Sequence, residues 1–118
     1  MKVNCIFLFI LVSSCLVGCH AASVTTFSGK RYSPTTEVKV YTDLSTIAKE
    51  YEEIGYVEAK GGATVSKQTL LDDMIEEAKK FGAHALIKIE FYDRARYDKY
   101  IGSYEKPAAK AVMIRFKE

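Results

Sequence analysis

The only thiols of the chain lie together near its start. The cysteines are Cys5, Cys15 and Cys19, and none follows in the rest of the 118-residue sequence. A cysteine thiolate is a strong nucleophile, so a thiol in a fixed position is a site for covalent modification. With no cysteine after Cys19, we expect the remaining chain to contain no disulfide and to depend on its own core for stability.

The residues before Cys19 have the order of an export signal. Lys2 gives a positive start, residues 5–12 are all apolar, and Ser13 and Ser14 lead into a cleavage region. The apolar run is shorter than the roughly 20 residues of a membrane-spanning helix, which disfavours the alternative of an uncleaved anchor. We therefore expect residues 1–18 to be a signal peptide.

The stretch Leu16-Val17-Gly18-Cys19 resembles the lipobox of bacterial lipoproteins. In that family diacylglycerol is attached to the cysteine thiol, and cleavage leaves the acylated cysteine as the first residue of the mature chain. The resemblance implies lipidation, with palmitate-type acyl chains, at Cys19. The segment 12–15 is a weaker lipobox, and ordinary secretory cleavage near 19–22 is a third possibility. Because His20 is not the Asp-type retention signal of that family, the resemblance implies the outer membrane, facing the periplasm.

A second chemically distinctive segment is "YDRARYDKYIGSYEK", residues 92–106. Tyrosine mixed with arginine is favoured at recognition surfaces, and connections this long are often functional. The alternative is an extended hairpin whose tyrosines pack against the sheet. The candidate partner-binding residues are Arg94, Arg96, Tyr97, Tyr100 and Tyr104, for an envelope protein or glycan. The small net charge of +2 argues against nucleic acid.

Residue types that perform catalysis or bind metals are present without the required arrangement. No sequence neighbour of His84 stands out as the second group of a catalytic pair, so we interpret this histidine as structural. The carboxylates of residues 72–77 fall on the polar face of a predicted helix, where a solvated charged surface is the ordinary role. A zinc site needs three or four ligands at suitable spacing, which His20 and His84 do not provide. We expect no catalytic residues, no metal and no cofactor.

These candidate sites have to be positioned by a small domain. Residues 20–33 are small and polar without periodicity, so 19–33 is predicted to be the lipidated cysteine and a flexible tether. Residues 34–118 are predicted to form a single domain. Alternating apolar residues predict strands at 37–42, 53–59, 84–93 and 110–117. In the last two, we expect one face to carry Ile87, Ile89 and Phe91, and another to carry Val112, Ile114 and Phe116.

Residues 66–82 form the clearest element, a helix with an apolar stripe at helical spacing. Ser66 or Thr69 suits its N-cap and Gly82 its end. We expect Leu71, Met74, Ile75 and Ala78 to face the sheet. The resulting order is β-β-α-β-β, which predicts an α+β fold: a four-stranded, mostly antiparallel sheet covered by one helix. Asp43 or Ser45 is expected to cap a short helical turn, and Gly55 to mark a bulge or close packing.

The segments "YEEIGYVEA" and "LLDDMIEEAKKFGAHALIKIEF" resemble a pattern in small bacterial envelope lipoproteins of the YbjQ-like fold, including the Rcs-system stress-sensor lipoprotein. The similarity covers roughly residues 36–92. It implies that fold and a place in the cell envelope, anchored to a membrane.

From the signal and the missing catalytic arrangement, we expect a lipid-anchored bacterial envelope protein with a non-catalytic binding, sensing or scaffolding role. The alternative is a small envelope hydrolase or carbohydrate-acting enzyme that uses surface carboxylates. Convergent titratable groups in a pocket would favour that alternative.

Overall fold

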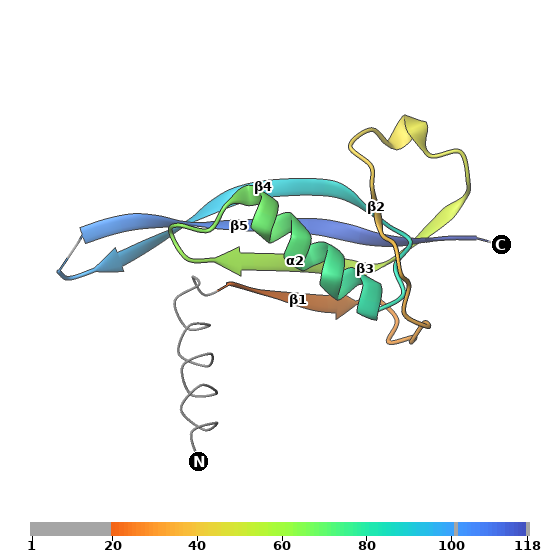
Figure 1. Cartoon of the computed structure of the whole chain (residues 1–118), viewed down its shortest axis with the longest axis horizontal. Helices are drawn as coiled ribbons and strands as arrows, with labels where there is room; N and C mark the ends of the chain where they lie inside the picture. Colours follow the sequence, from red (N-terminus) through yellow and green to blue (C-terminus); the bar gives the residue numbers. More distant parts are fainter. Residues whose placement is uncertain (1–19, 101, 118) are drawn as a thin grey trace, which may run out of the picture.

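One strand near the C-terminus lies at the centre of the structure, a computed structural model that describes residues 20–100 and 102–117. This strand, β5, pairs antiparallel with β3 on one side and with β4 on the other. The sheet order is β1-β3-β5-β4-β2 (Figure 1). In chain order the elements are β1 (His20–Thr26), β2 (Lys39–Val40), η2 (Leu44–Thr46), β3 (Tyr51–Gly61), α2 (Lys67–Lys80), β4 (Ala85–Asp98) and β5 (Gly102–Phe116). The predicted signal peptide, 1–18, and Cys19 lie outside the described residues.

The α+β class and the single covering helix are confirmed, whereas the predicted sheet is wrong in strand number and order. The sheet has five strands and is mixed, since β2 pairs parallel with β4 while β1–β3, β3–β5 and β4–β5 are antiparallel. The strand expected at 37–42 is reduced to β2, Lys39–Val40. The strands before and after the helix, β3 and β4, are not neighbours, because β5 is inserted between them.

The additional strand, β1, comes from residues expected to form a flexible tether. β1 pairs with β3 along its whole length, from His20 opposite Gly61 to Thr26 opposite Gly55. Its alternate residues Ala22 and Val24 pack against the core under the helix. The tether prediction is therefore wrong over these residues. Small and polar side chains are sufficient for an edge strand when a neighbouring strand supplies the hydrogen bonds.

Both ends of α2 follow from local sequence. The Ser66 side chain accepts a hydrogen bond from the Thr69 backbone N–H at 3.2 Å, which confirms the predicted cap. At the other end Gly82 has a φ of +78°, a conformation that glycine adopts without strain. A Cβ there would also lie 2.6 Å from the Tyr32 Cβ. The helix therefore ends where the sequence predicted.

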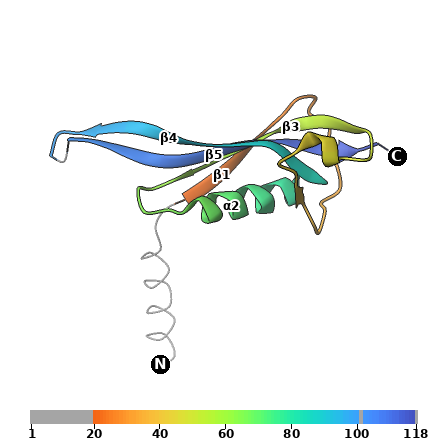
Figure 2. The same cartoon turned by 90° about the horizontal axis from the view of Figure 1, so that it is seen from above.

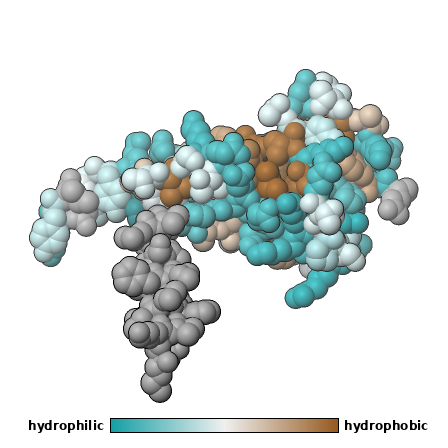
Figure 3. Space-filling model, viewed as in Figure 1, coloured by the Kyte–Doolittle hydropathy of each residue, from teal (hydrophilic) through white to brown (hydrophobic). Residues whose placement is uncertain are grey.

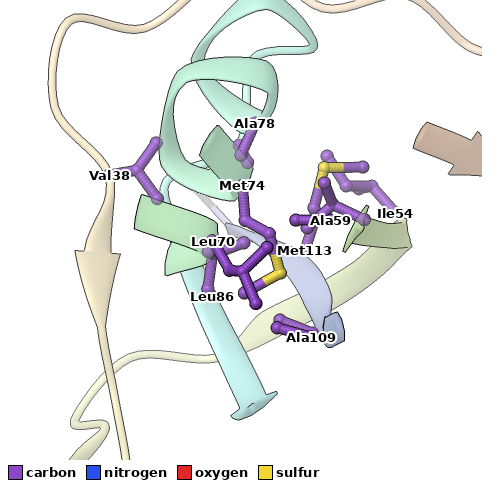
Figure 4. Packing of buried hydrophobic residues seen from close by; sticks show 12 residues of the cluster. Val38, Ile54, Ala59, Leu70, Met74, Ala78, Leu86, Ala109 and Met113 are labelled. Carbon is purple, nitrogen blue, oxygen red and sulfur yellow. The ribbon is translucent and has the colours of Figure 1, made fainter. Parts of the chain in front are cut away.

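The main core lies between α2 and the sheet (Figures 2 and 4). Leu70, Met74 and Ala78 on the helix are fully buried and meet Leu86 and Met113 from the sheet. The expected helix face was partly wrong, because Leu71 and Ile75 are only partly buried at its border. The true face is rotated toward Leu70. On this face the helix packs against the small residues Ala59, Ala109 and Ala111 of β3 and β5.

A bulge in β4 changes the face on which its side chains lie. The β4–β5 register shifts between Ile87 and Glu90, and Lys88 has a φ of 53°. Ile87 therefore packs on the face away from the helix, while Ile89 packs against the helix core. The prediction that Ile87, Ile89 and Phe91 share one face is wrong, because a two-residue alternation fails wherever a strand gains a residue.

On the sheet face opposite α2, a second and smaller core lies where β4 begins and β5 ends. Ala85, Ile87 and Ile114 are buried there under a group of partly buried side chains: Tyr41, Ile47, Tyr51, Val112 and Phe116. Val112, Ile114 and Phe116 thus share one face, as predicted. Asp43 caps the 3-10 turn η2 within the covering segment, accepting from the Ser45 N–H at 3.0 Å. On the α2 side of the molecule, which Figure 3 shows, hydrophobic residues gather over the middle, whereas the far ends of β4 and β5 are more polar.

The rotated helix face gives a direct stability prediction. We expect Leu70→Ala to lower the free energy of unfolding by about 2–5 kcal/mol, because it opens a cavity under the helix. Leu71→Ala, the same change one residue along, should cost clearly less, since Leu71 is only partly buried. Urea unfolding of both variants measures the difference. Equal losses would contradict the helix face described above.

Candidate functional site

The predicted recognition segment forms the outer ends of β4 and β5. The last β3–β5 pair is Lys60 with Ala108, but β4 and β5 continue to pair from Asp93–Pro107 to Asp98–Gly102. Beyond β3 the sheet is thus reduced to two strands, which we call the extension (residues 93–98 and 102–107). Figures 1 and 2 show it projecting past the other strands. Six residues of strand span about 20 Å.

The tip of the extension presents two large aromatic side chains to solvent. Tyr97 is 77% exposed and Tyr100 is 86% exposed. The Lys99 ammonium lies 5.0 Å from the centre of the Tyr100 ring. The extended hairpin of the alternative is present, since β4 and β5 stay paired out to Asp98 and Gly102. The rings of Tyr97 and Tyr100 are nevertheless exposed and do not pack against the sheet, as a partner surface requires.

The other candidate residues of the segment lie closer to the sheet. Arg94 and Tyr104 are half-buried. Arg94 donates from Nη2 to the Gly61 carbonyl at 3.2 Å, which ties the extension to the end of β3. Arg96 pairs in register with Tyr104, and its side chain lies outside the described part of the chain. The structure therefore divides the predicted set into a tip, Tyr97 and Tyr100, and a base.

Tyr92 anchors this base across the neighbouring strand. Its hydroxyl donates a hydrogen bond to the Glu58 carboxylate at 2.6 Å, reaching over β5 to β3. Burial, and then this hydrogen bond, raise the pKa of Tyr92 to about 12. The same hydrogen bond, helped by Lys60, holds the pKa of Glu58 below its ordinary value. The pair is a structural clamp that fixes where the extension begins.

A cavity of about 270 Å³ lies beside this clamp. It is lined by His20, Ala21, Lys60, Gly61, Gly62, Arg94 and Lys106. We call it the basic cavity, because its charged lining residues Lys60, Arg94 and Lys106 are all cationic. The Nε of Arg94 is buried and has no hydrogen-bond partner in the described part of the chain. Sequence reasoning missed this site, since four strands bring together residues that no motif connects.

A second, larger cleft of about 640 Å³ lies beside His84, at the start of β4. The Nδ1 of His84 accepts the Phe116 backbone N–H at 3.0 Å, and the two rings stack with centres 5.6 Å apart. These contacts support the structural interpretation of His84. The other lining residues are Glu37, Lys39, Lys49 and Lys117.

The helix carboxylates considered for acid–base chemistry are engaged on the surface of α2. Lys79 pairs with Glu76 and Lys80 with Glu77, each at 2.9 Å. Asp73 pairs with His20, and Asp72 accepts a hydrogen bond from Gln68. Among residues 20–100 and 102–117, no group of three or more His, Cys, Asp or Glu side chains is placed to hold a metal ion. In the same part of the chain, no helix is long and apolar enough to cross a membrane.

Comparison with known proteins adds no relative: no family model, no curated protein and no solved structure matches this chain. The resemblance to envelope lipoproteins and to the YbjQ-like fold therefore stays a prediction from the sequence.

The clamp makes a testable contribution to stability. We expect Tyr92→Phe to lower the free energy of unfolding at pH 7 by about 1 kcal/mol, the value of a hydrogen bond to a partly exposed charge. Because the pKa of Glu58 is lowered by folding, this contribution is present above its ordinary value of 4.5 and is lost as the pH falls through the folded-state pKa. Urea unfolding at pH 7 and pH 3 measures the change, and the wild type and variant should differ less at pH 3.

The dependence of stability on alkaline pH tests the Tyr92 side of the clamp. The folded state holds the Tyr92 proton to a pKa of about 12, against an ordinary 10.0, so wild-type stability should fall between these two pH values. The free energy of unfolding of Tyr92→Phe should decrease less over this pH range. Tyr56→Phe removes a more exposed hydroxyl, and its free energy of unfolding should change with pH as the wild type's does. A wild type and Tyr92→Phe with identical pH profiles would disprove the clamp.

Proposed function

We propose that this chain is a lipid-anchored protein of the bacterial cell envelope that binds a partner through the extension. The observation that carries the proposal is the exposure of Tyr97 and Tyr100 at the tip. Tyrosine combines a large apolar face with a polar hydroxyl, a composition favoured at binding surfaces. The partner is an envelope protein or a glycan, and either can cover such rings.

The energetics of the extension support a binding role. An isolated two-stranded hairpin is at best marginally stable in water. Every fully buried side chain of β4 and β5 in the described part of the chain lies between Ala85 and Ile114 and outside the extension. Ordering the extension costs conformational entropy without enlarging the core. Partner binding gives a reason for a protein to maintain it.

The proposal places the acylated residue at Cys19 and gives the chain no catalytic activity. The export signal of residues 1–18 and the lipobox-like segment support the first part. The engagement of the α2 carboxylates with Lys79, Lys80, His20 and Gln68 supports the second. On the same basis we propose the outer membrane, with the domain facing the periplasm.

The anchor is tested by changing the cysteines one at a time. Cys19→Ser should remove the acyl mass and release the protein from the membrane fraction, whereas Cys15→Ser should do neither. Buried acyl chains contribute about 0.8 kcal/mol per CH₂, so losing several chains abolishes lasting attachment. Mass spectrometry and fractionation are the measurements. A mature wild-type protein without lipid would refute the anchor, and recovery in the inner membrane would refute the outer-membrane assignment.

The partner surface is tested with a double change at the tip. Tyr97→Ala with Tyr100→Ala should abolish partner capture while leaving the melting temperature nearly unchanged, because both rings are exposed. The matched control, Phe27→Ala with Tyr56→Ala, removes two other exposed rings and should keep capture. Crosslinking in intact envelopes detects a protein partner, and co-sedimentation with isolated cell-wall glycan detects a sugar. Unchanged capture by both assays would rule out the tip as the binding surface.

A further inference from the structure

The structure leaves almost no chain between the proposed anchor and the folded domain. His20 is already paired with Gly61 in the sheet. Consecutive Cα atoms are about 3.8 Å apart, so residue 19 lies within one step of β1. A domain attached at this residue has no long linker that would separate it from the membrane surface. Whatever surrounds His20 must lie at the membrane surface.

The basic cavity adjoins His20, which is one of its lining residues and also pairs with Asp73 of α2. The headgroup layer of a bilayer is about 5–8 Å deep on each side, judged from the total and hydrocarbon thicknesses. A cavity that begins one residue from an acylated cysteine therefore falls inside that layer. The anions present at this depth are lipid phosphates.

The charges of the basic cavity fit such an anion. Its described lining residues include Lys60, Arg94 and Lys106 and no carboxylate. Two acids contact lining residues and already have partners, since Glu58 accepts from Tyr92 and pairs with Lys60 at 3.2 Å, and Asp73 pairs with His20. The Lys60–Glu58 pair is exposed, with the Lys60 side chain 52% accessible, so its ammonium can exchange partners.

Arg94 supplies the fixed element of the cavity. One of its nitrogens is held by the Gly61 carbonyl at 3.2 Å, which locks the guanidinium at the junction of β3, β4 and the loop before α2. Its buried Nε has no partner in the described residues. A planar guanidinium held in this way suits a phosphate, to which it can donate in a directed geometry.

We propose that the basic cavity binds the phosphate of an anionic phospholipid headgroup in the membrane that carries the anchor, and so fixes the orientation of the domain. This inference rests on the proposed lipid anchor at Cys19. The acyl chains supply attachment, and the cavity supplies direction. Because the extension begins at Arg94 and its neighbours, seating the cavity on the headgroups also sets the direction in which Tyr97 and Tyr100 point.

The distribution of cysteines makes this inference measurable. With Cys5 and Cys15 in the signal and Cys19 acylated, an introduced cysteine becomes the single reactive thiol of the mature protein. Ala63→Cys places a fluorescent label on an exposed residue of the loop after Gly62, beside the cavity. Ser45→Cys places the same label on an exposed residue of η2, away from the residues that line the basic cavity.

The acylated protein is reconstituted in nanodiscs that contain a lipid with a spin-labelled, fluorescence-quenching headgroup. The discs are made of phosphatidylcholine with or without phosphatidylglycerol. We expect phosphatidylglycerol to increase quenching at residue 63 and not at residue 45. Each cation near an anionic leaflet strengthens binding by about fivefold. Lys60→Gln with Lys106→Gln should therefore lower, by about 25-fold, the ratio of protein with its cavity bound to headgroups to protein with its cavity free. The increase in quenching at residue 63 should then be lost.

Matched variants separate the specific site from general charge. Lys39→Gln with Lys117→Gln removes the same charge at the His84 cleft and should keep the increase at residue 63. Arg94→Lys keeps the charge but removes the planar guanidinium donors. It should weaken the increase in quenching at residue 63 without unfolding the protein. The inference is overturned if quenching at residue 63 does not change with phosphatidylglycerol. It is also overturned if the two double lysine variants lose the increase equally.

Two further outcomes are distinguishable. A preparation whose mass shows no acyl group refutes the proposed function before any disc is made. An acylated protein whose residue 63 stays unquenched with phosphatidylglycerol, while Lys60→Gln with Lys106→Gln loses a crosslinked envelope protein, assigns the basic cavity to that protein and overturns the headgroup assignment alone.

Discussion

The pairing of β5 with both β3 and β4 is the interaction on which the rest of this structure depends. It joins the two strands that flank α2 in the sequence, although they are not neighbours in the sheet. It also places the small residues Ala109 and Ala111 under the helix, where Leu70 and Met74 pack. Because β5 follows β3 and β4 in the sequence, it has to insert between two strands that precede it for the sheet to be complete.

The unequal lengths of the three central strands account for the functional features. β3 ends at Gly61, whereas β4 and β5 run on together to Asp98 and Gly102. The part of the β4–β5 pair that runs beyond β3 is the extension, and the basic cavity lies at the step where β3 stops. The Tyr92–Glu58 hydrogen bond and the Arg94 contact with Gly61 hold this step in place. One structural event, the end of a strand, therefore produces both candidate sites.

The two ends of the sheet differ in composition in a way that suits an anchored protein. The end that carries His20 holds the basic cavity and the polar extension. The opposite end is closed by Tyr41, Ile47 and Tyr51 over a second small core. The larger core lies under α2 and the smaller one at this opposite end, whereas the residues of the basic cavity lie at the end that carries His20. An arrangement of this kind lets surface residues contact lipid or partner without disturbing the packed interior.

The sequence by itself determined those features that depend on neighbours along the chain. The cap at Ser66, the end at Gly82, the single helix and the common face of Val112, Ile114 and Phe116 all follow from local hydrogen bonding or two-residue alternation. The composition of 92–106 also identified the exposed tyrosines of the tip. Only the tertiary structure decided that residues 20–26 form a strand, because their hydrogen-bond partners lie in β3. It likewise decided the bulge at Lys88, which exchanges the faces of β4, and the basic cavity, whose residues come from four strands. These features arise from contacts between distant segments, and such contacts leave no periodic trace in the sequence.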